Sequence, residues 1–266
     1  MSSPSAVSDP GALVRVEGLS KTYPGGVRAL ASVSFTVAPG EFIGILGPSG
    51  AGKTTLFRCL TGLARPDRGS VEIHGRDICG LAGRNLRAAR REVAMIFQQF
   101  NLIRRLSAIE NVLAGRLAAQ PTWRVFTRTF ARPDRQKALW CLDTVGLLEK
   151  AYTRADQLSG GQQQRVAIAR ALAQEATVIL ADEPVGSLDP ESAATVLDTL
   201  RSVAARGVAV IASLHQVGLA TDYADRIIAL RDGRVLEDAP TRTFDARALE
   251  QIYERSVAPA GGGAGG

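Results

Sequence analysis

Several residue types are scarce in this sequence, and each scarcity narrows the possible functions. Its three cysteines, Cys59, Cys79 and Cys141, are widely spaced and form no C-x-x-C pattern, which argues against a disulfide framework and against a cysteine zinc site. No apolar run approaches the roughly 20 residues that span a bilayer, and residues 1–12 lack the apolar stretch of a secretory leader. The sequence therefore predicts a protein that is neither secreted nor membrane-spanning, with reduced thiols in its core.

Lysine is also scarce, because Lys21, Lys53, Lys137 and Lys150 are the only lysines among 32 basic residues. The net charge of +6 thus comes mostly from arginine. A basic surface suits nucleic acid, anionic lipid headgroups or phosphate ligands, and charge alone does not choose between them. With 266 residues and 45% hydrophobic content, the chain can bury a full core. We expect one elaborated domain over residues 13–258, with disordered low-complexity ends at 1–12 and 259–266.

The apolar pattern predicts two kinds of strand. Residues 13–17, 33–37 and 71–73 alternate apolar and polar side chains, which is typical of half-exposed antiparallel strands. Four other segments are continuously apolar, as expected of parallel strands covered by helices: residues 42–46, 93–97, 177–181 and 208–212. Helical stretches separate these four segments, so the core should be α/β.

Two further segments complete the expected architecture. Residues 100–165 contain no comparable strand and predict helices inserted between two core strands, interrupted by a basic, aromatic-containing stretch at 121–135. Near the end, Asp232 and Gly233 separate two apolar runs. Because Asp-Gly adopts the positive φ angles of a type I′ turn, this segment predicts a β-hairpin.

The strongest motif directly follows the apolar run at 42–46. It satisfies the pattern G-x-x-x-x-G-K-[ST], and its residues are Gly47, Pro48, Ser49, Gly50, Ala51, Gly52, Lys53, Thr54 and Thr55. Glycines let backbone N–H groups converge on phosphate oxygens, and a helix beginning near Lys53 adds its positive end. Lys53 would neutralise the β- and γ-phosphates, and Thr54 would offer its hydroxyl to Mg²⁺. The motif predicts a nucleotide-phosphate site.

Two carboxylates, Asp182 and Glu183, follow the apolar run at 177–181. Ligands of an open α/β sheet collect at the carboxyl ends of its strands, so we expect both side chains near the phosphate loop. Asp182 would hold Mg²⁺ through its water shell, and Glu183 would take a proton from the attacking water as a general base. The alternative is a solvated acidic pair at a strand end.

Gln98 and His215 follow two other apolar runs, so four strand ends are expected at one place. Gln98 would complete the shell of Mg²⁺ and water, and His215 would contact the γ-phosphate and align the water with Glu183. Each residue taken alone is equally an ordinary loop residue. His74, the other histidine, lies on an alternating strand and is expected to be structural.

A second anion-binding pattern opens a helix predicted over residues 162–174. Ser159, Gly160 and Gly161 precede this helix, and a Ser-Gly-Gly start leaves backbone N–H groups available to an anion. Without other motifs this pattern would be an ordinary helix cap.

The motifs occur together in the order found in ABC ATPases, which they resemble from about residue 14 to residue 238. In chain order these are the phosphate loop, Gln98, the signature-like Leu158 to Gln162, Asp182 with Glu183, Ser187-Leu188-Asp189, and His215. The resemblance implies an α/β ABC ATPase fold, in which a P-loop NTPase core carries an antiparallel β subdomain and an inserted helical subdomain at about 99–167. Gly186 follows Val185 where many members have Thr-Ala or Val-Ala, and this departure leaves every catalytic residue in place.

The resemblance also implies a composite site with ATP and Mg²⁺ as its ligands. In this family, ATP held by the phosphate loop of one protomer is capped by the other protomer, here through Ser159, Gly160, Gly161, Gln162 and Asp189. Tyr23 matches the aromatic residue on which adenine stacks, although a strand-end aromatic would look the same.

The expected partners are a second copy of the chain, transmembrane permease subunits and, indirectly, a substrate-binding protein. The subunit would lie peripherally on the cytoplasmic face of a bacterial inner membrane. Import is favoured over export because the chain resembles stand-alone importer cassettes. A soluble ABC ATPase acting on nucleic acid would need a coiled coil, zinc insertions or a second cassette, so no nucleic acid is expected. A small-molecule P-loop kinase would need a substrate lid and no Ser-Gly-Gly signature.

The substrate is indicated by resemblance alone. Residues 95–102, 104–107, 111–113 and 115–117, with the stretch after Trp123, look like phosphonate-importer ATPases. Importers of polar amino acids share part of the stretch around Gln98 and remain the alternative. The same residues also suit simple packing of a helical lobe with a solvated basic face.

Overall fold

The computed structural model describes residues 11–119 and 130–244. Most of the predicted N-terminal tract, the C-terminal tail and Trp123 lie outside the described residues. Within the described ranges, no helix is both long enough and apolar enough to cross a membrane.

The first sheet is antiparallel, with the strand order β2-β1-β4-β5. Its strands are β1 (Val14–Thr22), β2 (Arg28–Val37), β4 (Arg68–Ile73) and β5 (Arg76–Asp77). Val14, Val16 and Leu19 of β1 are buried in a common core, whereas the residues between them are more exposed. This alternation confirms the predicted half-exposed strands, which run several residues longer than predicted.

The second sheet has the order β10-β9-β3-β8-β7-β6 and contains the four continuously apolar segments. Its strands are β3 (Phe42–Leu46), β6 (Val93–Ile96), β7 (Val178–Asp182), β8 (Ala209–Ser213), β9 (Arg226–Arg231) and β10 (Arg234–Pro240). Strands β3, β8, β7 and β6 pair in parallel, so their carboxyl ends lie at one edge of the sheet. Strands β9 and β10 form the predicted hairpin, with φ of 49° at Asp232 and 71° at Gly233.

Helix α1 (Lys53–Leu60) packs between the two sheets. Its Leu56 and Phe57 are fully buried with Val16 of the first sheet and with Ile43 and Ile45 of β3. Burial of side chains this large contributes about 1.5–3 kcal/mol each. The packing holds the start of α1, and with it the phosphate loop, rigidly against both sheets.

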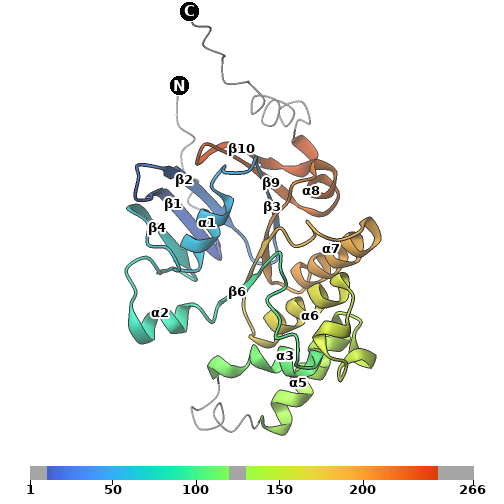
Figure 1. Cartoon of the computed structure of the whole chain (residues 1–266). Coiled ribbons are helices and arrows are strands. Elements are labelled where there is room, and N and C mark those ends of the chain that lie inside the picture. The colour runs from blue at the N-terminus through green and yellow to red at the C-terminus, as the bar shows by residue number, and fades with distance from the viewer. Residues whose placement is uncertain (1–10, 120–129, 245–266) are drawn as a thin grey trace, which may run out of the picture.

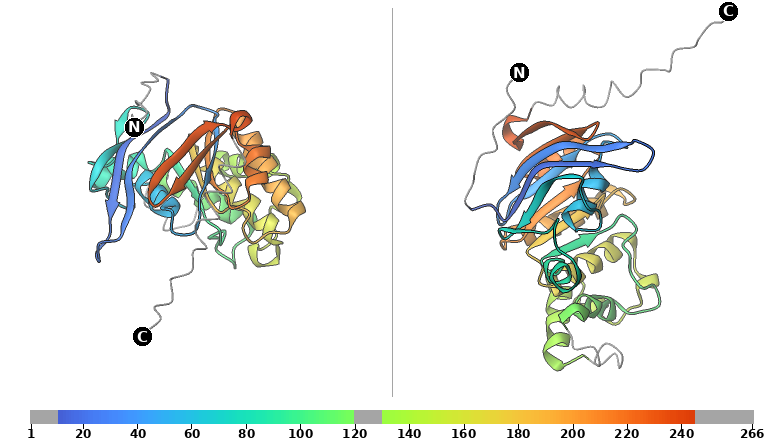
Figure 2. Two further views of the ribbon diagram at one scale, coloured as in Figure 1. Left: turned by 90° about the horizontal axis from the view of Figure 1, so that it is seen from above. Right: turned by 90° about the vertical axis from the view of Figure 1, so that its left-hand side faces the viewer.

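Helix α2 (Gly83–Ala89) lies on the side of α1, because its buried Ala89 belongs to the same core. The other helices pack on the other face of the second sheet and beyond its edge (Figures 1 and 2). They are α3 (Ala108–Ala114), α5 (Arg132–Thr144), α6 (Gly160–Ala173), α7 (Pro190–Ala204) and α8 (Val217–Tyr223), and short 3₁₀ turns are η1 (Leu117–Ala119), η2 (Leu148–Lys150), η3 (Ala155–Gln157) and η4 (Thr241–Thr243). Helices α3 and α5 pack on α6, and α6 also packs on α7. The helical subdomain was expected to end at about residue 167. Helix α6 continues to Ala173, so no chain break separates the helical subdomain from the core at that residue.

Candidate functional site

The phosphate loop joins β3 to α1, and its glycines lie where a side chain would collide with backbone. Gly52, which precedes α1, has φ of 107°, and a Cβ there would approach the carbonyl oxygen of Ala29 to 2.4 Å. A Cβ on Gly47 would lie 2.2 Å from the carbonyl oxygen of Leu230. The glycines are therefore required by the close approach of β2 and β9 as well as by the left-handed backbone.

Lys53 lies inside this loop, with only 6% of the residue exposed. Its Nζ donates hydrogen bonds to the carbonyl oxygens of Gly47 (2.6 Å) and Pro48 (3.1 Å). Burial lowers the pKa of Lys53, while the nearby carboxylates of Glu183 and Asp182 raise it. The ammonium is thus held within the loop, facing the two acids at the end of β7.

Hydroxyl and carboxylate groups from three elements meet beside the loop. Thr54 Oγ1 on α1 donates to Asp182 Oδ2 at 3.4 Å, and Ser213 Oγ on β8 donates to Asp182 Oδ1 at 2.9 Å. Such hard oxygen donors suit Mg²⁺, which keeps few protein ligands and fills its shell with water and phosphate oxygens. Consistent with this, the described residues contain no cluster of three or more His, Cys, Asp or Glu side chains that would hold a metal alone.

Glu183 is held from two sides at the end of β7. Its backbone N–H donates to Ser213 Oγ (2.8 Å), and its Oε1 lies 2.5 Å from His215 Nε2. Its φ is 50°, a left-handed conformation that is uncommon for residues other than glycine and that clusters at functional sites. A Cβ added to Gly186 would lie 3.3 Å from Gln98 Nε2 and 3.6 Å from Glu183 Oε2. Gln98, Glu183 and His215 therefore converge as predicted from the strand ends.

The Ser-Gly-Gly pattern forms the start of α6. Ser159 is the N-cap residue and forms a capping box with Gln162: Ser159 Oγ accepts from the Gln162 N–H (3.3 Å), and the Gln162 side chain accepts from the Ser159 N–H (3.1 Å). A Cβ on Gly161 would lie 2.9 Å from Ser192 Cβ. Asp189 caps α7 in the same way, accepting from the Ser192 N–H at 2.9 Å. Two capped helix starts thus lie side by side.

The segment from Gln98 to Asn101 connects the two groups of residues. Phe100 and Asn101 both have positive φ, 55° and 50°. Arg170 on α6 donates to the carbonyl oxygens of Asn101 (2.6 Å) and Phe100 (3.3 Å), and its burial lowers its pKa. The Phe100 ring lies 3.6 Å from where a Cβ of Gly160 would be. Gln98, at one end of this segment, and Glu183 therefore both lie beside Gly186, and Phe100 lies beside the start of α6.

Sequence reasoning missed Ser213, Arg170 and Asn111. Ser213 is a fully buried hydroxyl at the end of an apolar strand, and Asn111 is a buried amide that bonds Ile103 through both its carbonyl oxygen and its amide nitrogen. Arg170 is a charged side chain in a mostly apolar helix. Each is a polar residue within a segment of otherwise apolar residues. Such a residue could have been singled out in the sequence, because a buried polar group needs a specific hydrogen-bond partner.

Tyr23 and His74 lie apart from these contacts. Tyr23 follows β1, its ring centroid is 5.8 Å from Lys21 Nζ, and its buried hydroxyl has no partner among the described residues. It lines a hollow of about 410 Å³ with Lys21, Arg58 and Leu63. His74 Nε2 lies 2.8 Å from Thr177 Oγ1 and so links the two sheets.

Similar proteins share most of this chain. The ABC transporter family profile matches residues 30–186. The phosphonates import ATP-binding protein PhnC of Bdellovibrio bacteriovorus is 50% identical over 258 residues, covering 95% of this chain and 98% of that protein. The hypophosphite import ATP-binding protein HtxD of Stutzerimonas stutzeri is 48% identical over 242 residues, covering 91% and 71%.

Solved structures agree in fold. The dimeric structure of MJ0796, a bacterial ABC transporter cassette, has a TM-score of 0.75 at 36% identity and covers 87% of this chain and 100% of that one. A post-hydrolysis dimer of the same cassette, bound to ADP and Pi, has a TM-score of 0.73 at the same identity and coverage. The fold class predicted from the motifs is confirmed, and the chain belongs to the ABC transporter family as an ATP-binding cassette with ATPase function.

Proposed function

We propose that this ATPase drives import of a phosphonate or a related phosphorus oxyanion and that Glu183 is its general base. The observation that supports the catalytic part is the position of Glu183. Its carboxylate is bonded to His215 and its backbone to Ser213, beside Asp182 and the phosphate loop. The names of the similar phosphonate and hypophosphite import proteins support the substrate class.

ATP would be held by the phosphate loop, from Gly47 to Thr55, with its base against Tyr23. Thr54 and Asp182 are the residues that would hold Mg²⁺, together with Gln98, and the bound ion supplies positive charge that neutralises the phosphates. Lys53 contributes a further buried cation. Because the loop carbonyls already hold Lys53 in place, little reorganisation is needed when phosphate replaces them.

Glu183 accepts the proton of the attacking water. His215 Nε2, 2.5 Å from Glu183 Oε1, holds that carboxylate in position toward the water. A positioned general base contributes about 10²- to 10⁴-fold. Gln98, which lies with Glu183 beside Gly186, orients the same water.

The active form is a homodimer in which Ser159, Gly160, Gly161, Gln162 and Asp189 of one copy cap ATP on the other. The dimeric structures of the similar cassette MJ0796 support contribution in trans. The dimer closes and reopens, and this movement is transmitted to transmembrane permease subunits. The subunit lies on the cytoplasmic face of the membrane, and the substrate-binding protein acts through the permease.

The catalytic part is tested with Glu183→Gln. Turnover should fall by about 10²- to 10⁴-fold while ATP binding persists, because the amide cannot accept the proton. An ATP-bound dimer should accumulate in size-exclusion chromatography. Glu191→Gln, a change to an exposed acid on α7, is the matched control and should hydrolyse ATP normally. Residual activity of Glu183→Gln within a few-fold of wild type would remove Glu183 from this role.

The dimer is tested by crosslinking. Cysteines placed at Ser49 and Ser159 in a chain without its three native cysteines should form disulfides between copies only when ATP is present. Crosslinks confined to single chains would contradict the arrangement.

The substrate is tested by deleting the gene and supplying a phosphonate as the sole phosphorus source. Growth should fail there and persist on inorganic phosphate, and the wild-type gene should restore it. Normal phosphonate uptake with lost uptake of a polar amino acid would favour the alternative importer class and leave the ATPase unaffected.

A further inference from the structure

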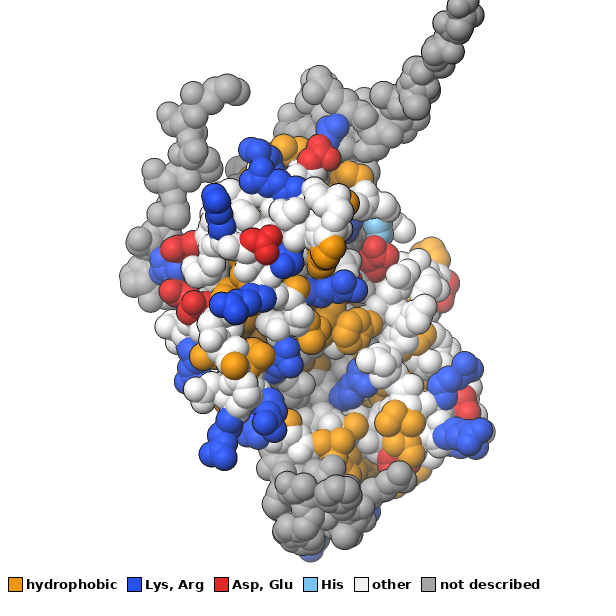
Figure 3. All heavy atoms as spheres, turned by 60° about the vertical axis from the view of Figure 1, so that its left-hand side comes forward, with side chains coloured by type: hydrophobic (Ala, Val, Ile, Leu, Met, Phe, Trp, Pro, Cys, Tyr) orange, Lys and Arg blue, Asp and Glu red, His pale blue; other side chains and the backbone are white. Residues whose placement is uncertain are grey.

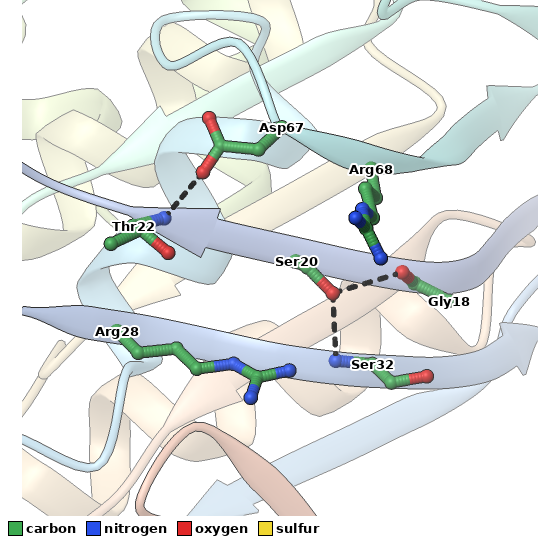
Figure 4. Close-up of a pocket in the computed structure, with 7 residues that line it drawn as sticks. All are labelled: Gly18, Ser20, Thr22, Arg28, Ser32, Asp67 and Arg68. Carbon is green, nitrogen blue, oxygen red and sulfur yellow. Dashed lines mark hydrogen bonds between the residues drawn. The ribbon is translucent and has the colours of Figure 1, made fainter. Parts of the chain in front are cut away.

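A hollow of about 510 Å³ lies on the first sheet and is lined by residues that are exposed or half-buried (Figure 4). It is lined by Gly18, Ser20, Thr22, Arg28, Ser32, Asp67 and Arg68. None of these residues takes part in the nucleotide site described above. The lining contains two arginines, three hydroxyl groups and one carboxylate.

Strand pairing places the two arginines on opposite sides of β1. Arg28 of β2 is opposite Thr22, and Arg68 of β4 is opposite Ser20. In Figure 4 Arg68 points toward Gly18 and Ser20 on β1, and Arg28 runs along β2 toward Ser32. The two side chains thus line one hollow from the two strands that flank β1.

Neither arginine has a protein partner among residues 11–119 and 130–244. Asp67 is the only acid in the lining, and it is already engaged by Lys21 Nζ (3.0 Å) and by the Thr22 N–H (2.6 Å). The Thr22 N–H and then Lys21 hold the pKa of Asp67 below its usual range. The hydroxyls of Thr22 and Ser32 likewise have no hydrogen-bond partner in the described chain. The hollow therefore has two unneutralised cations and two free hydroxyls.

Two positive charges that line one hollow repel each other, although β1 separates their strands. Figure 3 shows lysine and arginine side chains gathered on the side of the molecule that carries this sheet, with fewer acids between them. A bound anion would remove the repulsion. The planar fork of a guanidinium matches the oxygens of a phosphate or phosphonate group, and serine and threonine hydroxyls donate to the same oxygens.

We propose that Arg28 and Arg68, with Thr22 and Ser32, form a second oxyanion site that binds a phosphate-class group. This site goes beyond the import function. It lies at the end of the β1–β2 hairpin, because β1 ends at Thr22 and β2 begins at Arg28, and the turn between them carries Tyr23. An oxyanion bound to both strands would hold that turn and so change the affinity for nucleotide.

The site is tested by calorimetric titration of the full chain with inorganic phosphate and with methylphosphonate. Lys53→Ala is the background, because it disables the phosphate loop as a competing site. Arg28→Ala and Arg68→Ala should each weaken binding about tenfold, as expected for loss of one charge-assisted contact, and the double variant should show none. Arg76→Ala is the matched control, since Arg76 is exposed on β5 of the same sheet and outside the hollow.

Equal phosphate binding by the double variant and its background would overturn the proposal. An equal loss in Arg76→Ala would also overturn it, because the effect would then be general surface charge. Unfolding temperatures of all variants show whether the fold is intact, and Arg28→Lys with Arg68→Lys should retain weak binding without the fork geometry.

A second pair of measurements identifies the source of the phosphate group. Flotation with phosphatidylglycerol vesicles, against phosphatidylcholine vesicles, tests a lipid headgroup. Vesicle binding that requires both arginines supports the site with a lipid ligand, and binding of free phosphate or phosphonate supports it with a soluble ligand. No binding of either kind would refute it, as would arginine-dependent binding of single-stranded RNA alone. In a chain that keeps Lys53, Arg28→Ala combined with Arg68→Ala should retain the basal ATPase rate, so failure of this site is distinct from failure of the Glu183 proposal.

Discussion

The two halves of the candidate ATP site differ in how they are held. Around the phosphate loop, side chains from α1, β7 and β8 bond to one another, with Asp182, Ser213 and Glu183 linked in a row. At the starts of α6 and α7, the side chains of Ser159 and Asp189 accept hydrogen bonds from their own first turns. The first half is organised across the fold, and the second is organised locally.

This difference explains what each half can do alone. A cluster that is crosslinked by hydrogen bonds holds catalytic groups in place before a ligand arrives. A capped helix start is rigid but presents its remaining N–H groups outward, ready for an anion supplied by another molecule. The segment from Gln98 to Asn101 lies near both halves, with Gln98 near Glu183 and Phe100 near Gly160, and residues 183–189 also lead from Glu183 to the start of α7.

The largest effect is expected from Ser213→Ala, which removes the hydroxyl that links Asp182 to Glu183 beside the phosphate loop. Loss of a buried hydroxyl leaves the Glu183 N–H unsatisfied, at a cost of about 1–3 kcal/mol. Because small misplacements of catalytic groups are costly, kcat should fall by about tenfold to a hundredfold. Ser202→Ala on the exposed side of α7 is the control. A steady-state assay that finds unchanged kcat for Ser213→Ala would mean that the row is not needed for catalysis.

A smaller effect is expected from Gly161→Ala, which disturbs the second half. The new Cβ would lie 2.9 Å from Ser192 Cβ, so α6 and α7 must separate. Overpacking of this kind costs about 1–3 kcal/mol, and both the unfolding temperature and the ATPase rate should drop. Adding Ser192→Gly frees the space and should restore stability. If stability returns while activity does not, the glycine is required by the ligand and not by its own packing.

Arg170→Met tests the connection between the halves and should have a more modest effect. The methionine keeps the apolar contacts of the stem but loses both hydrogen bonds to the carbonyls of Phe100 and Asn101. ATP binding by isolated subunits should be unchanged, while ATPase stimulation by the permease should fall several-fold. Arg170→Lys, which can still donate to one carbonyl, should recover part of the lost stimulation. Equal loss of basal and stimulated rates would argue for a general structural role.

The smallest effect is expected far from both halves, at Glu175. The hydrogen bond from Arg116 and then the bond from Lys137 lower the pKa of Glu175 from 4.5, even though burial opposes the shift. This lowered value means that the stabilisation is present above about pH 4.5 and is lost as pH falls through the folded-state pKa. Glu175 is about half exposed while Arg116 is mostly buried, and solvent screening at Glu175 limits the contribution to about 0.2–1 kcal/mol. Unfolding curves of wild type and Glu175→Gln should differ slightly at neutral pH and converge in acid; a constant difference would contradict this.

Most of the fold could be predicted because its signals are local. The continuous apolar runs became parallel strands, the alternating ones became a half-exposed antiparallel sheet, and Asp232-Gly233 became a hairpin turn. Side-chain periodicity depends on neighbours within a few residues, so it can be recognised in the sequence alone. The helix predicted over residues 162–174 is α6 (Gly160–Ala173), whereas its packing on both α3 and α7 depends on the tertiary structure.

The sequence by itself determined the chemistry of this protein: the phosphate-loop pattern, the paired acids after an apolar strand and the Ser-Gly-Gly helix start are defined by residue types at short spacing. Only the tertiary structure decided which side chains hold that chemistry in place. Ser213 bonds residues 30 positions away, Arg170 bonds a loop 69 positions away, and Arg28 and Arg68 flank one strand from two others. Such contacts depend on strand order and helix packing, and spacing along the chain carries no information about them.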